Sequence, residues 1–279
     1  MSKHAYEVAG GRRYEFGENW RRFLARLTPR QIDEAGRSLS AMLGRDSLTG
    51  QAFLDIGSGS GLFSLAARKL GARVHSFDYD PRSVACTRAL KDQYFAEDSQ
   101  WTIEEGSVLD RGYIESLGRF DVVYAWGVLH HTGALEQAMN HAALPVAAGG
   151  QLYVAIYNYQ PIWTRFHTAV KRTYVASPRP LRAVIAGGSM AFHATRGLVK
   201  DLVLLRDPTA RYRNYNRLRG MSWWHDQLDW IGGYPFEAAT PDDVQAFYRQ
   251  RDFELERMTT CGKLPGCNEF VFRRRAHDA

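Results

Sequence analysis

Three glycines stand at alternate positions in the sequence FLDIGSGSGLFSLAA, residues 53–67, directly after an apolar run that carries one acid. Because glycine has no Cβ atom, a loop with Gly57, Gly59 and Gly61 can turn sharply and bring its backbone against a ligand. The dinucleotide-binding fingerprint needs its third glycine one residue later, where this chain has Leu62. The spacing therefore favours a ligand that lacks a pyrophosphate group.

Side chains suited to acid–base chemistry are found elsewhere in the chain, and the candidates are His130, His131, Tyr157 and His225. The two adjacent histidines follow an apolar run at 120–125, and Tyr157 follows another at 151–156. A structural role is the alternative for either of the adjacent histidines. His225 precedes Asp226, and this pair fits an oriented base or, more simply, a solvated helix face.

These residues must be positioned by elements that alternate between strand and helix from residue 52 onward. Continuous apolar runs are typical of parallel strands that are buried on both faces. The predicted strands are 52–56, 73–78, 101–104, 120–125, 151–156, 253–260 and 268–274, and the helices between them are 62–70, 81–94, 135–144 and 241–250. The pattern predicts an α/β fold with a doubly wound, mostly parallel, seven-stranded sheet. In such sheets the ligand binds beyond the carboxyl ends of the strands.

Four regions are predicted along the chain. Residues 1–50 form a helical cap, with helices at 19–27 and from Pro29 to about Leu43. Residues 51–156 form the ligand-binding core, and residues 240–279 complete its sheet. Residues 157–239 interrupt the alternation as a largely helical, basic and aromatic-rich insertion, with helical stretches at 161–175 and 180–205.

Composition limits the classes of protein that the chain can represent. Its 279 residues carry a net charge of +6, yet residues 157–219 hold twelve Lys and Arg against two Asp and Glu. An anionic partner is therefore expected at the insertion. Apolar runs such as 198–205 are too short to span a membrane, and the first residues contain no signal-peptide core. Three cysteines without metal-ligand spacing indicate reduced thiols, a cytoplasmic protein and no bound metal.

Five motifs, in order, resemble those of the class I S-adenosylmethionine-dependent methyltransferases. They are LDIGSGSG, VHSFDYDP, EEGSVLD, FDVVYAWGVLHHT and AAGGQLYVAIYN, the last with Ala148 in place of the usual proline. The resemblance covers residues 51–156 and, as the terminal helix and strand pair, 240–274. It implies a Rossmann-like fold, S-adenosyl-L-methionine as cofactor and S-adenosyl-L-homocysteine as product. The glycine loop would then admit the methionine half of the cofactor.

The resemblance also implies roles for single residues. Asp78 would bind the ribose hydroxyls through a bidentate carboxylate. Asp55 would order the loop amides and face the methionine amino group, and Ser107 and Val108 would flank the adenine ring. The whole set implied to contact the cofactor is Asp55, Gly57, Ser58, Gly59, Gly61, Asp78, Tyr79, Ser107, Val108 and Trp126. Tyr14, Phe16 and Trp20 would cover the sulfonium, or alternatively only dock the N-terminal helix.

The insertion is expected to form a lid over the methyl group. The residues expected to contact the acceptor are Asn158, Trp223, Trp224, Asp226 and Tyr234, with core packing as the alternative for the aromatic ones. The leading hypothesis is a methyltransferase that acts by in-line displacement on a small-molecule acceptor, at oxygen first and at nitrogen or sulfur next. An inward-facing arginine would suit an anionic acceptor. The alternatives are a tRNA-modifying methyltransferase and a non-catalytic cofactor-binding protein, and the apolar faces of the insertion are compatible with a homodimer.

Overall fold

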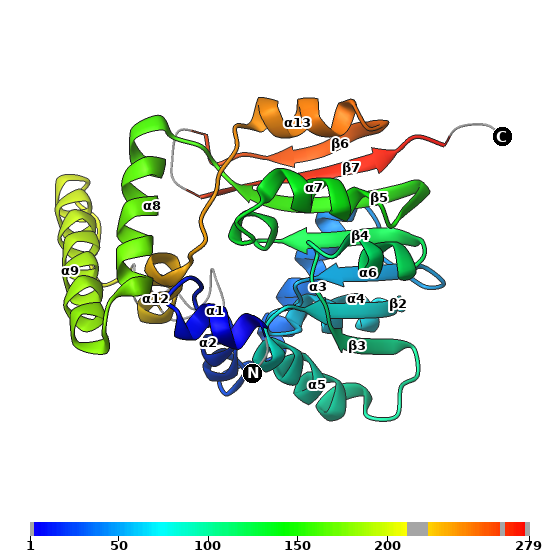
Figure 1. The fold of residues 1–279 in the computed structure, drawn as a ribbon, viewed down its shortest axis with the longest axis horizontal. Coiled ribbons are helices and arrows are strands. Elements are labelled where there is room, and N and C mark those ends of the chain that lie inside the picture. Colours follow the sequence, from blue (N-terminus) through cyan, green and yellow to red (C-terminus); the bar gives the residue numbers. More distant parts are fainter. Residues whose placement is uncertain (1–2, 211–222, 263–265, 277–279) are drawn as a thin grey trace.

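The computed structural model describes residues 3–210, 223–262 and 266–276, and for residues 223–226 and 229 it describes the backbone alone. A seven-stranded sheet forms the centre of this part of the chain, in the order β3-β2-β1-β4-β5-β7-β6 (Figure 1). The strands are β1 Ala52–Ile56, β2 Arg73–Asp78, β3 Trp101–Glu105, β4 Phe120–Trp126, β5 Val146–Tyr157, β6 Phe253–Thr259 and β7 Cys267–Arg274. Among these seven strands, β7 runs opposite to the other six, so its pairings with β5 and β6 are antiparallel. The predicted doubly wound, mostly parallel sheet is confirmed.

Helices cover both faces of the sheet because successive side chains of a strand point to opposite faces. Phe53 packs in one core with α3 Pro29–Leu43, α4 Leu62–Lys69 and α5 Pro81–Phe95. Its neighbour Leu54 packs in the other core with α6 Arg111–Ser116, α7 Leu135–Ala143 and α13 Pro241–Arg249. The helices therefore form a layer on each side of the sheet, and the carboxyl ends of the parallel strands stay free of them (Figure 1).

Local sequence explains where several helices begin. Thr28 and Gln31 form a capping box at the start of α3, and Thr240 and Asp243 form another at the start of α13. Asp80 caps α5 by accepting a hydrogen bond from the amide of Arg82. Proline occupies the first turn of each of these three helices, where its missing N–H is not needed.

The N-terminal region differs from the prediction. Residues 3–24, here called the N-terminal cover, contain α1 Lys3–Ala9, which was not predicted, and α2 Phe16–Leu24. The second helix begins three residues before the predicted Asn19, because aromatic residues from Phe16 onward take part in its packing. β5 also begins before the predicted Gln151, at Val146, where its register against β4 shifts.

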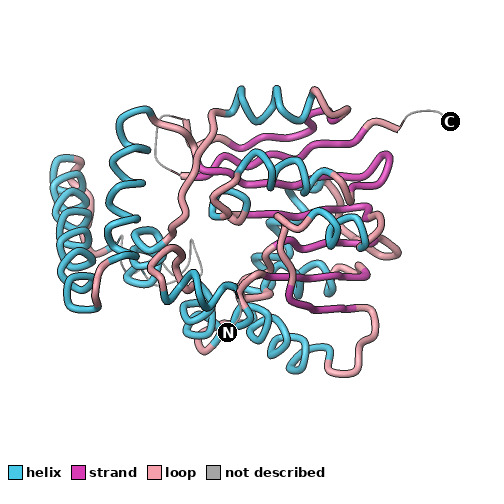
Figure 2. Tube along the Cα trace, viewed as in Figure 1, coloured by secondary structure: helices cyan, strands magenta, loops and turns pink. Residues whose placement is uncertain are grey.

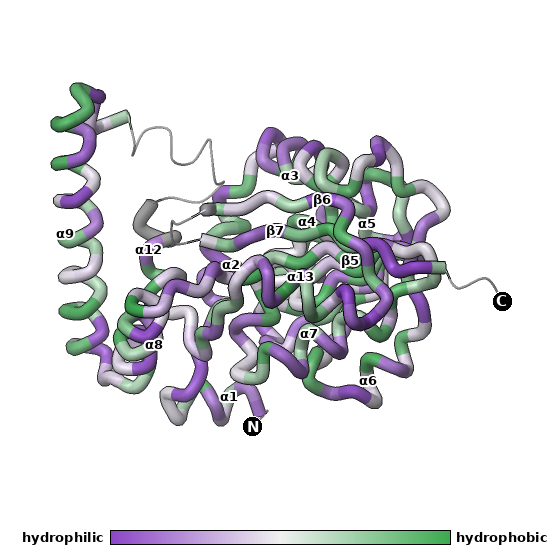
Figure 3. The backbone as a smooth tube through the Cα atoms, turned by 90° about the horizontal axis from the view of Figure 1, so that it is seen from above, coloured by the Kyte–Doolittle hydropathy of each residue, from purple (hydrophilic) through white to green (hydrophobic). Residues whose placement is uncertain are grey.

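The insertion contains α8 Pro161–Ala176, α9 Arg179–Val203 and α12 Trp223–Gly232. These three helices contact one another beyond the carboxyl end of β5 (Figures 1 and 2). Viewed from above, α9 lies beside α8 on the side away from the sheet (Figure 3). Among the described residues, no helix combines the length and the apolar character that crossing a membrane requires.

Candidate active site

A cavity of about 2320 Å³ lies between the carboxyl ends of the strands, the N-terminal cover and the insertion helices. Pockets for ordinary small ligands measure about 300–1,000 Å³. The cavity reaches from the glycine loop after β1 to side chains of α8, α9 and α12. It therefore has room for a nucleoside cofactor and a second molecule.

The glycine loop needs its glycines for two different reasons. Gly57, Gly59 and Gly61 have φ angles of +72°, +55° and +81°, which side chains rarely adopt. Gly57 and Gly59 line the cavity, and a Cβ on Gly59 would lie 3.1 Å from the indole of Trp20. Gly61 does not line the cavity, because its Cα packs against α5, where a Cβ would lie 2.8 Å from the Cα of Thr87. Gly61 therefore shapes the loop from behind, and a direct contact of Gly61 with the ligand stays a prediction.

Asp78 ends β2 at the edge of the cavity and is held by backbone amides. The amide of Gly59 donates to its Oδ2 at 2.9 Å, and the amide of Asp80 donates to its Oδ1 at 2.8 Å. Burial raises the pKa of Asp78 to about 6. Since each carboxylate oxygen can accept a second hydrogen bond, Asp78 keeps the capacity to bind a pair of ribose hydroxyls.

Asp55 is buried under the loop and accepts a hydrogen bond from the hydroxyl of Ser64. The amides of Gly57 and Ser58 instead donate to the carbonyl of Phe77, at 2.8 and 3.0 Å. In the structure, the carbonyl of Phe77 and the carboxylate of Asp78 hold the loop amides, in place of the predicted Asp55. Burial raises the pKa of Asp55 to about 7, and the nearby carboxylate of Asp78 adds to the effect.

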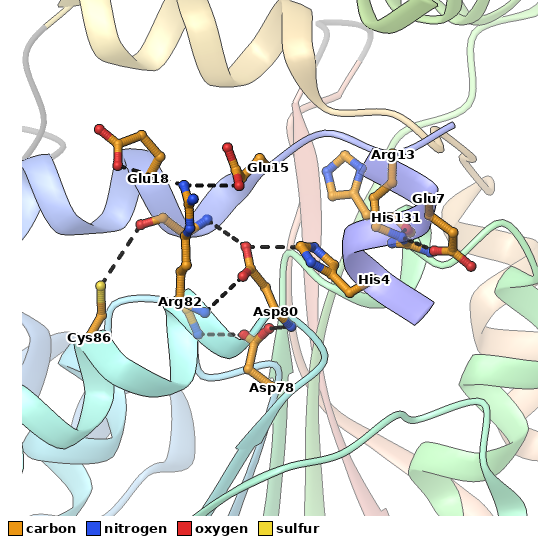
Figure 4. A network of polar contacts seen from close by, with 12 residues as sticks. His4, Glu7, Arg13, Glu15, Glu18, Asp78, Asp80, Arg82, Cys86 and His131 are labelled. Carbon is orange, nitrogen blue, oxygen red and sulfur yellow. Dashed lines mark hydrogen bonds and ion pairs between the residues drawn. The ribbon is translucent and has the colours of Figure 1, made fainter. Parts of the chain in front are cut away.

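The N-terminal cover is attached to the turn after β2 (Figure 4). The amide of Gly17 donates to Asp80 at 2.8 Å, and Arg82 pairs with Glu15 at 2.9 Å. A Cβ on Gly17 would lie 2.9 Å from the amide of Ser83, so only glycine allows this approach. The attachment brings three predicted cover residues to the cavity: Tyr14, Phe16 and Trp20.

Three of the four predicted acid–base residues meet at the cavity wall. The ring of Tyr157 lies 4.1 Å from that of His130 and 5.6 Å from that of His131, measured between centroids. Burial, aided by the charge of Lys171, lowers the pKa of His131 to about 3 and that of His130 well below its ordinary value. Both imidazoles are therefore neutral near pH 7. The fourth residue, His225, belongs to α12, and its side chain lies outside the described residues.

The remaining predicted residues divide into three groups. Those that line the cavity are Ser58, Tyr79, Ser107, Val108, Trp126 and Asn158. Tyr234 does not line it but packs beside the insertion helices, where its carbonyl accepts from the amide of Tyr14 at 3.0 Å. The side chains of Trp223, Trp224 and Asp226 lie outside the described residues.

Sequence reasoning missed two residues that shape the site. Arg13 donates to the carbonyl of His131 at 2.9 Å, and its guanidinium lies 5.0 Å from the centroid of the Tyr79 ring. Lys171 is completely buried, with its ammonium 4.5 Å from the ring centroid of Trp230. His167 and Lys171 are four residues apart, which places both on one face of a helix, and this spacing was the signal in the sequence that could have identified Lys171.

The sheet order, the glycine loop after β1 and the acid at the end of β2 define a Rossmann-like site for a nucleoside joined to an amino acid. Among the described residues, no group of three or more His, Cys, Asp or Glu could hold a metal ion. The residues around the loop fit S-adenosylmethionine, with Asp78 available to the ribose and an open backbone at Gly59.

Comparison with known proteins agrees with this class. A family model described as "Methyltransferase domain" matches residues 12–186. The chain therefore belongs to the class I S-adenosylmethionine-dependent methyltransferases, and S-adenosylmethionine is its cofactor. The structure of magnesium protoporphyrin IX methyltransferase from Synechocystis PCC 6803 with bound SAH has the same fold, with a TM-score of 0.53, 16% identity and coverage of 92% of this chain and 93% of that one.

Curated relatives are similar to the chain over a shorter range. Ubiquinone biosynthesis O-methyltransferase from Marinobacter nauticus is 34% identical over 42% of this chain and 48% of its own length. The protein of the same name from a Methylobacterium strain is 28% identical over 42% of this chain and 45% of its own length. The chain thus spans about half the length of the curated relatives it matches.

Proposed function

We propose that the protein transfers a methyl group from S-adenosylmethionine to a small-molecule acceptor, at oxygen by preference and at nitrogen or sulfur as alternatives. The observation that carries this proposal is the single cavity that joins the glycine loop to Tyr157, His131 and the insertion helices. Supporting it, the curated relatives are named as O-methyltransferases.

The roles of single residues follow from this proposal. Asp78 binds the ribose, Ser107 and Val108 flank the adenine, and Trp20 and Phe16 cover the sulfonium. Asp55, Ser58, Tyr79 and Trp126 complete the cofactor site, and Asn158 faces the acceptor. Residues 157–239 act as the acceptor lid on a core formed by residues 51–156 and 240–279, with residues 1–50 as the cap.

When bound, S-adenosylmethionine supplies a methyl group on a sulfonium, which is already activated for displacement. The protein has to align the acceptor atom and exclude water. Neutral imidazoles at His130 and His131 place no like charge beside the sulfonium, whereas two imidazolium ions would repel it. The Nδ1 of His131 lies 2.7 Å from the carbonyl oxygen of Pro235, so it carries the proton and leaves Nε2 to accept a hydrogen bond that orients the acceptor hydroxyl. The hydroxyl proton passes to solvent as the acceptor ionises, and the oxygen–methyl bond then forms while the methyl–sulfur bond breaks.

Methyl-labelled S-adenosylmethionine tests the proposal directly. The protein is incubated with catechol, dihydroxybenzoate, caffeate, a thiol and a primary amine, and the products are separated by mass. A labelled methyl ether is the expected product. A metabolite extract is tested in the same way. If calorimetry detects cofactor binding but neither the extract nor any of these acceptors receives label, the non-catalytic alternative replaces the proposal.

Total tRNA serves as a further acceptor in the same assay. A tRNA-modifying enzyme would label it, and its affinity would fall steeply between about 50 mM and about 200 mM salt as counterions are released. The proposal expects no label in tRNA. The Arg- and Tyr-rich run that suggested this alternative, residues 211–219, lies outside the described residues.

A further inference from the structure

Five rings from three insertion helices form a continuous row along the outer part of the cavity. The rings, here called the ring row, belong to Trp163 and His167 of α8, Trp230 of α12, and His193 and Phe192 of α9. His167 and His193 meet Trp230 edge-on, with centroids 4.6 and 5.5 Å away. All five residues line the same cavity as the glycine loop.

The two ends of the ring row are open to solvent. Trp163 is 54% exposed and Phe192 is 58% exposed, although both are large apolar side chains. Clustered exposed aromatic rings at the mouth of a cavity are typical of a ligand-binding groove. Burial lowers the pKa of His167 to about 4 and also lowers that of His193, so the imidazoles are neutral near pH 7. The rings of the ring row are therefore uncharged and largely aromatic, and the buried ammonium of Lys171, 4.5 Å from the centroid of Trp230, does not itself line the cavity.

A cation stands at one end of this wall. Arg196 follows Phe192 by one helical turn, lines the same cavity and is exposed. Arg196 also follows His193 by three residues on α9, so the two side chains are neighbours on the helix surface, and the charge of Arg196 helps to lower the pKa of His193. Among the described residues no carboxylate forms an ion pair with Arg196. Its guanidinium is thus available to a carboxylate, which it can bind with two parallel hydrogen bonds.

The position of the ring row in the cavity determines how far an acceptor must extend to reach it. The glycine loop follows β1, whereas the rings belong to the insertion helices beyond the end of β5, two positions away in the sheet, so a nucleoside cofactor at the loop would leave the ring row unoccupied (Figure 1). We infer that the ring row is a subsite for the far end of an elongated acceptor, whose aromatic body lies against the rings and whose carboxylate pairs with Arg196. This inference rests on the proposed function and adds the chemical class of the acceptor.

Calorimetry with two probes of one shape tests the subsite on the full-length protein saturated with S-adenosylhomocysteine. The probes are biphenylcarboxylate and the neutral biphenylmethanol, both as para isomers. We expect the carboxylate to bind more tightly. Arg196→Gln should weaken carboxylate binding by about tenfold, the worth of a hydrogen bond between charged groups, and leave the alcohol within about twofold. Arg165→Gln removes the same charge from an exposed position of α8 outside the cavity and should change neither affinity.

A second variant tests the aromatic wall. Trp163→Ala, at an exposed position that does not threaten folding, should weaken both probes by about fivefold to tenfold, in line with lost aromatic contact area. Equal effects of the Arg196 and Arg165 variants, or equal affinity of the two probes, would overturn the carboxylate assignment. Protein that binds S-adenosylhomocysteine but neither probe would overturn the subsite and leave the proposed function intact. Failure to bind S-adenosylhomocysteine would count against the proposed function itself.

Discussion

The rings of His130 and His131 lie 4.5 Å apart between centroids, and the Nδ1 of one meets a hydrogen-bond donor while the Nδ1 of the other meets an acceptor. The Nδ1 of His130 accepts from the amide of Tyr157 at 3.4 Å, whereas the Nδ1 of His131 faces the carbonyl oxygen of Pro235 at 2.7 Å. The proton of His130 is therefore assigned to Nε2 and that of His131 to Nδ1. The pair offers one buried donor and one acceptor, and the Nε2 of His130 has no hydrogen-bond partner among the described residues.

This arrangement predicts how the rate depends on pH. Because the pKa of His131 is about 3, the imidazole accepts a hydrogen bond without becoming charged over the physiological range. With saturating cofactor, kcat should therefore show no histidine limb between about pH 5.5 and 8 and should rise only as the acceptor itself ionises. A limb with a midpoint near the ordinary histidine pKa of about 6.5 would contradict the assignment.

His131→Asn separates the hydrogen bond that orients the side chain from the hydrogen bond that the Nε2 of His131 accepts. The asparagine amide can still donate to the carbonyl of Pro235, but the acceptor nitrogen Nε2 is lost. Because the ring positions the acceptor without taking its proton, we expect kcat to fall by about tenfold, the worth of one hydrogen bond, with the dissociation constant of the cofactor unchanged within about twofold. His75→Asn, on β2 and outside the cavity, is the matched control and should keep full kcat. A wild-type rate in the His131 variant would show that its ring only packs.

Asp78→Ala should weaken binding of S-adenosylhomocysteine by about 1.5–3 kcal/mol, the usual worth of hydrogen bonds to a charged group. The loss arises from the ribose contacts and from the freed amide of Gly59, which Asp78 holds at 2.9 Å. Calorimetry measures the affinity, and thermal unfolding without cofactor checks the fold. An exposed carboxylate, Asp46, provides the control variant Asp46→Ala, which should bind normally. Equal affinities for the two variants would remove Asp78 from the cofactor site.

Gly59→Val tests whether the backbone of the loop must stay open to the cofactor. A side chain at φ +55° strains the chain by about 1–2 kcal/mol and also enters the space in front of Trp20. Gly118→Val imposes similar strain at φ +83°, with no atom within 4 Å of the new Cβ. Both variants should lose similar stability in thermal unfolding, but only the Gly59 variant should lose cofactor binding. If both variants bind the cofactor, the loop does not contact it closely.

The parts of the site that sequence could predict are those set by neighbouring residues. The turn at Gly59 was predicted because a strand, a turn and a helix follow each other directly, and the role of Asp78 was implied by the motif VHSFDYDP, whose residues are also neighbours in the sequence. The contact between Gly17 and Asp80 joins positions 63 apart and depends on how α2 packs on α5, which no local pattern encodes. The rings around Trp230 come from three helices, and the inward face of each helix is decided by its neighbours. The sequence predicted an arginine that could bind an anionic acceptor but did not single out Arg196, because its place at the cavity depends on how α9 packs against α8 and α12.

The attachment of the N-terminal cover gives a further prediction. Gly17→Ala would place a methyl group 2.8 Å from Oδ2 of Asp80 and 2.9 Å from the amide of Ser83, so the cover should shift away from α5. We expect trypsin to cleave after Arg21 and Arg22 faster than in the wild type, and cofactor to dissociate faster. Gly36→Ala, in α3 with open space around it, should instead stabilise the protein by about 0.5–1 kcal/mol. Unchanged proteolysis in the Gly17 variant would mean that the cover is not held at this contact.

Asp55 should destabilise the cofactor-free protein at neutral pH. Its folded pKa is about 7, above the ordinary value of about 3.9, so between these values the folded state keeps a proton that the unfolded state has lost. Stability should therefore fall as pH rises through this window, and the full effect, on the order of 4 kcal/mol, should be present above about pH 7. Asp55→Asn removes the titration, so the variant should unfold several degrees higher than the wild type at pH 8 and at the same temperature near pH 4.

The same substitution should act in the opposite direction on the cofactor. An ionised Asp55 favours a cationic ligand, so Asp55→Asn should bind S-adenosylmethionine more weakly while being more stable without it. Unfolding temperatures of both proteins at pH 8, with and without cofactor, measure the two effects in one experiment, and Asp46→Asn controls for the loss of an exposed charge. A variant that is less stable than the wild type at every pH would show that Asp55 is ionised in the folded protein throughout. Burial would then be offset by the hydrogen bond from Ser64, because a charged acceptor gains more from that bond than a neutral one.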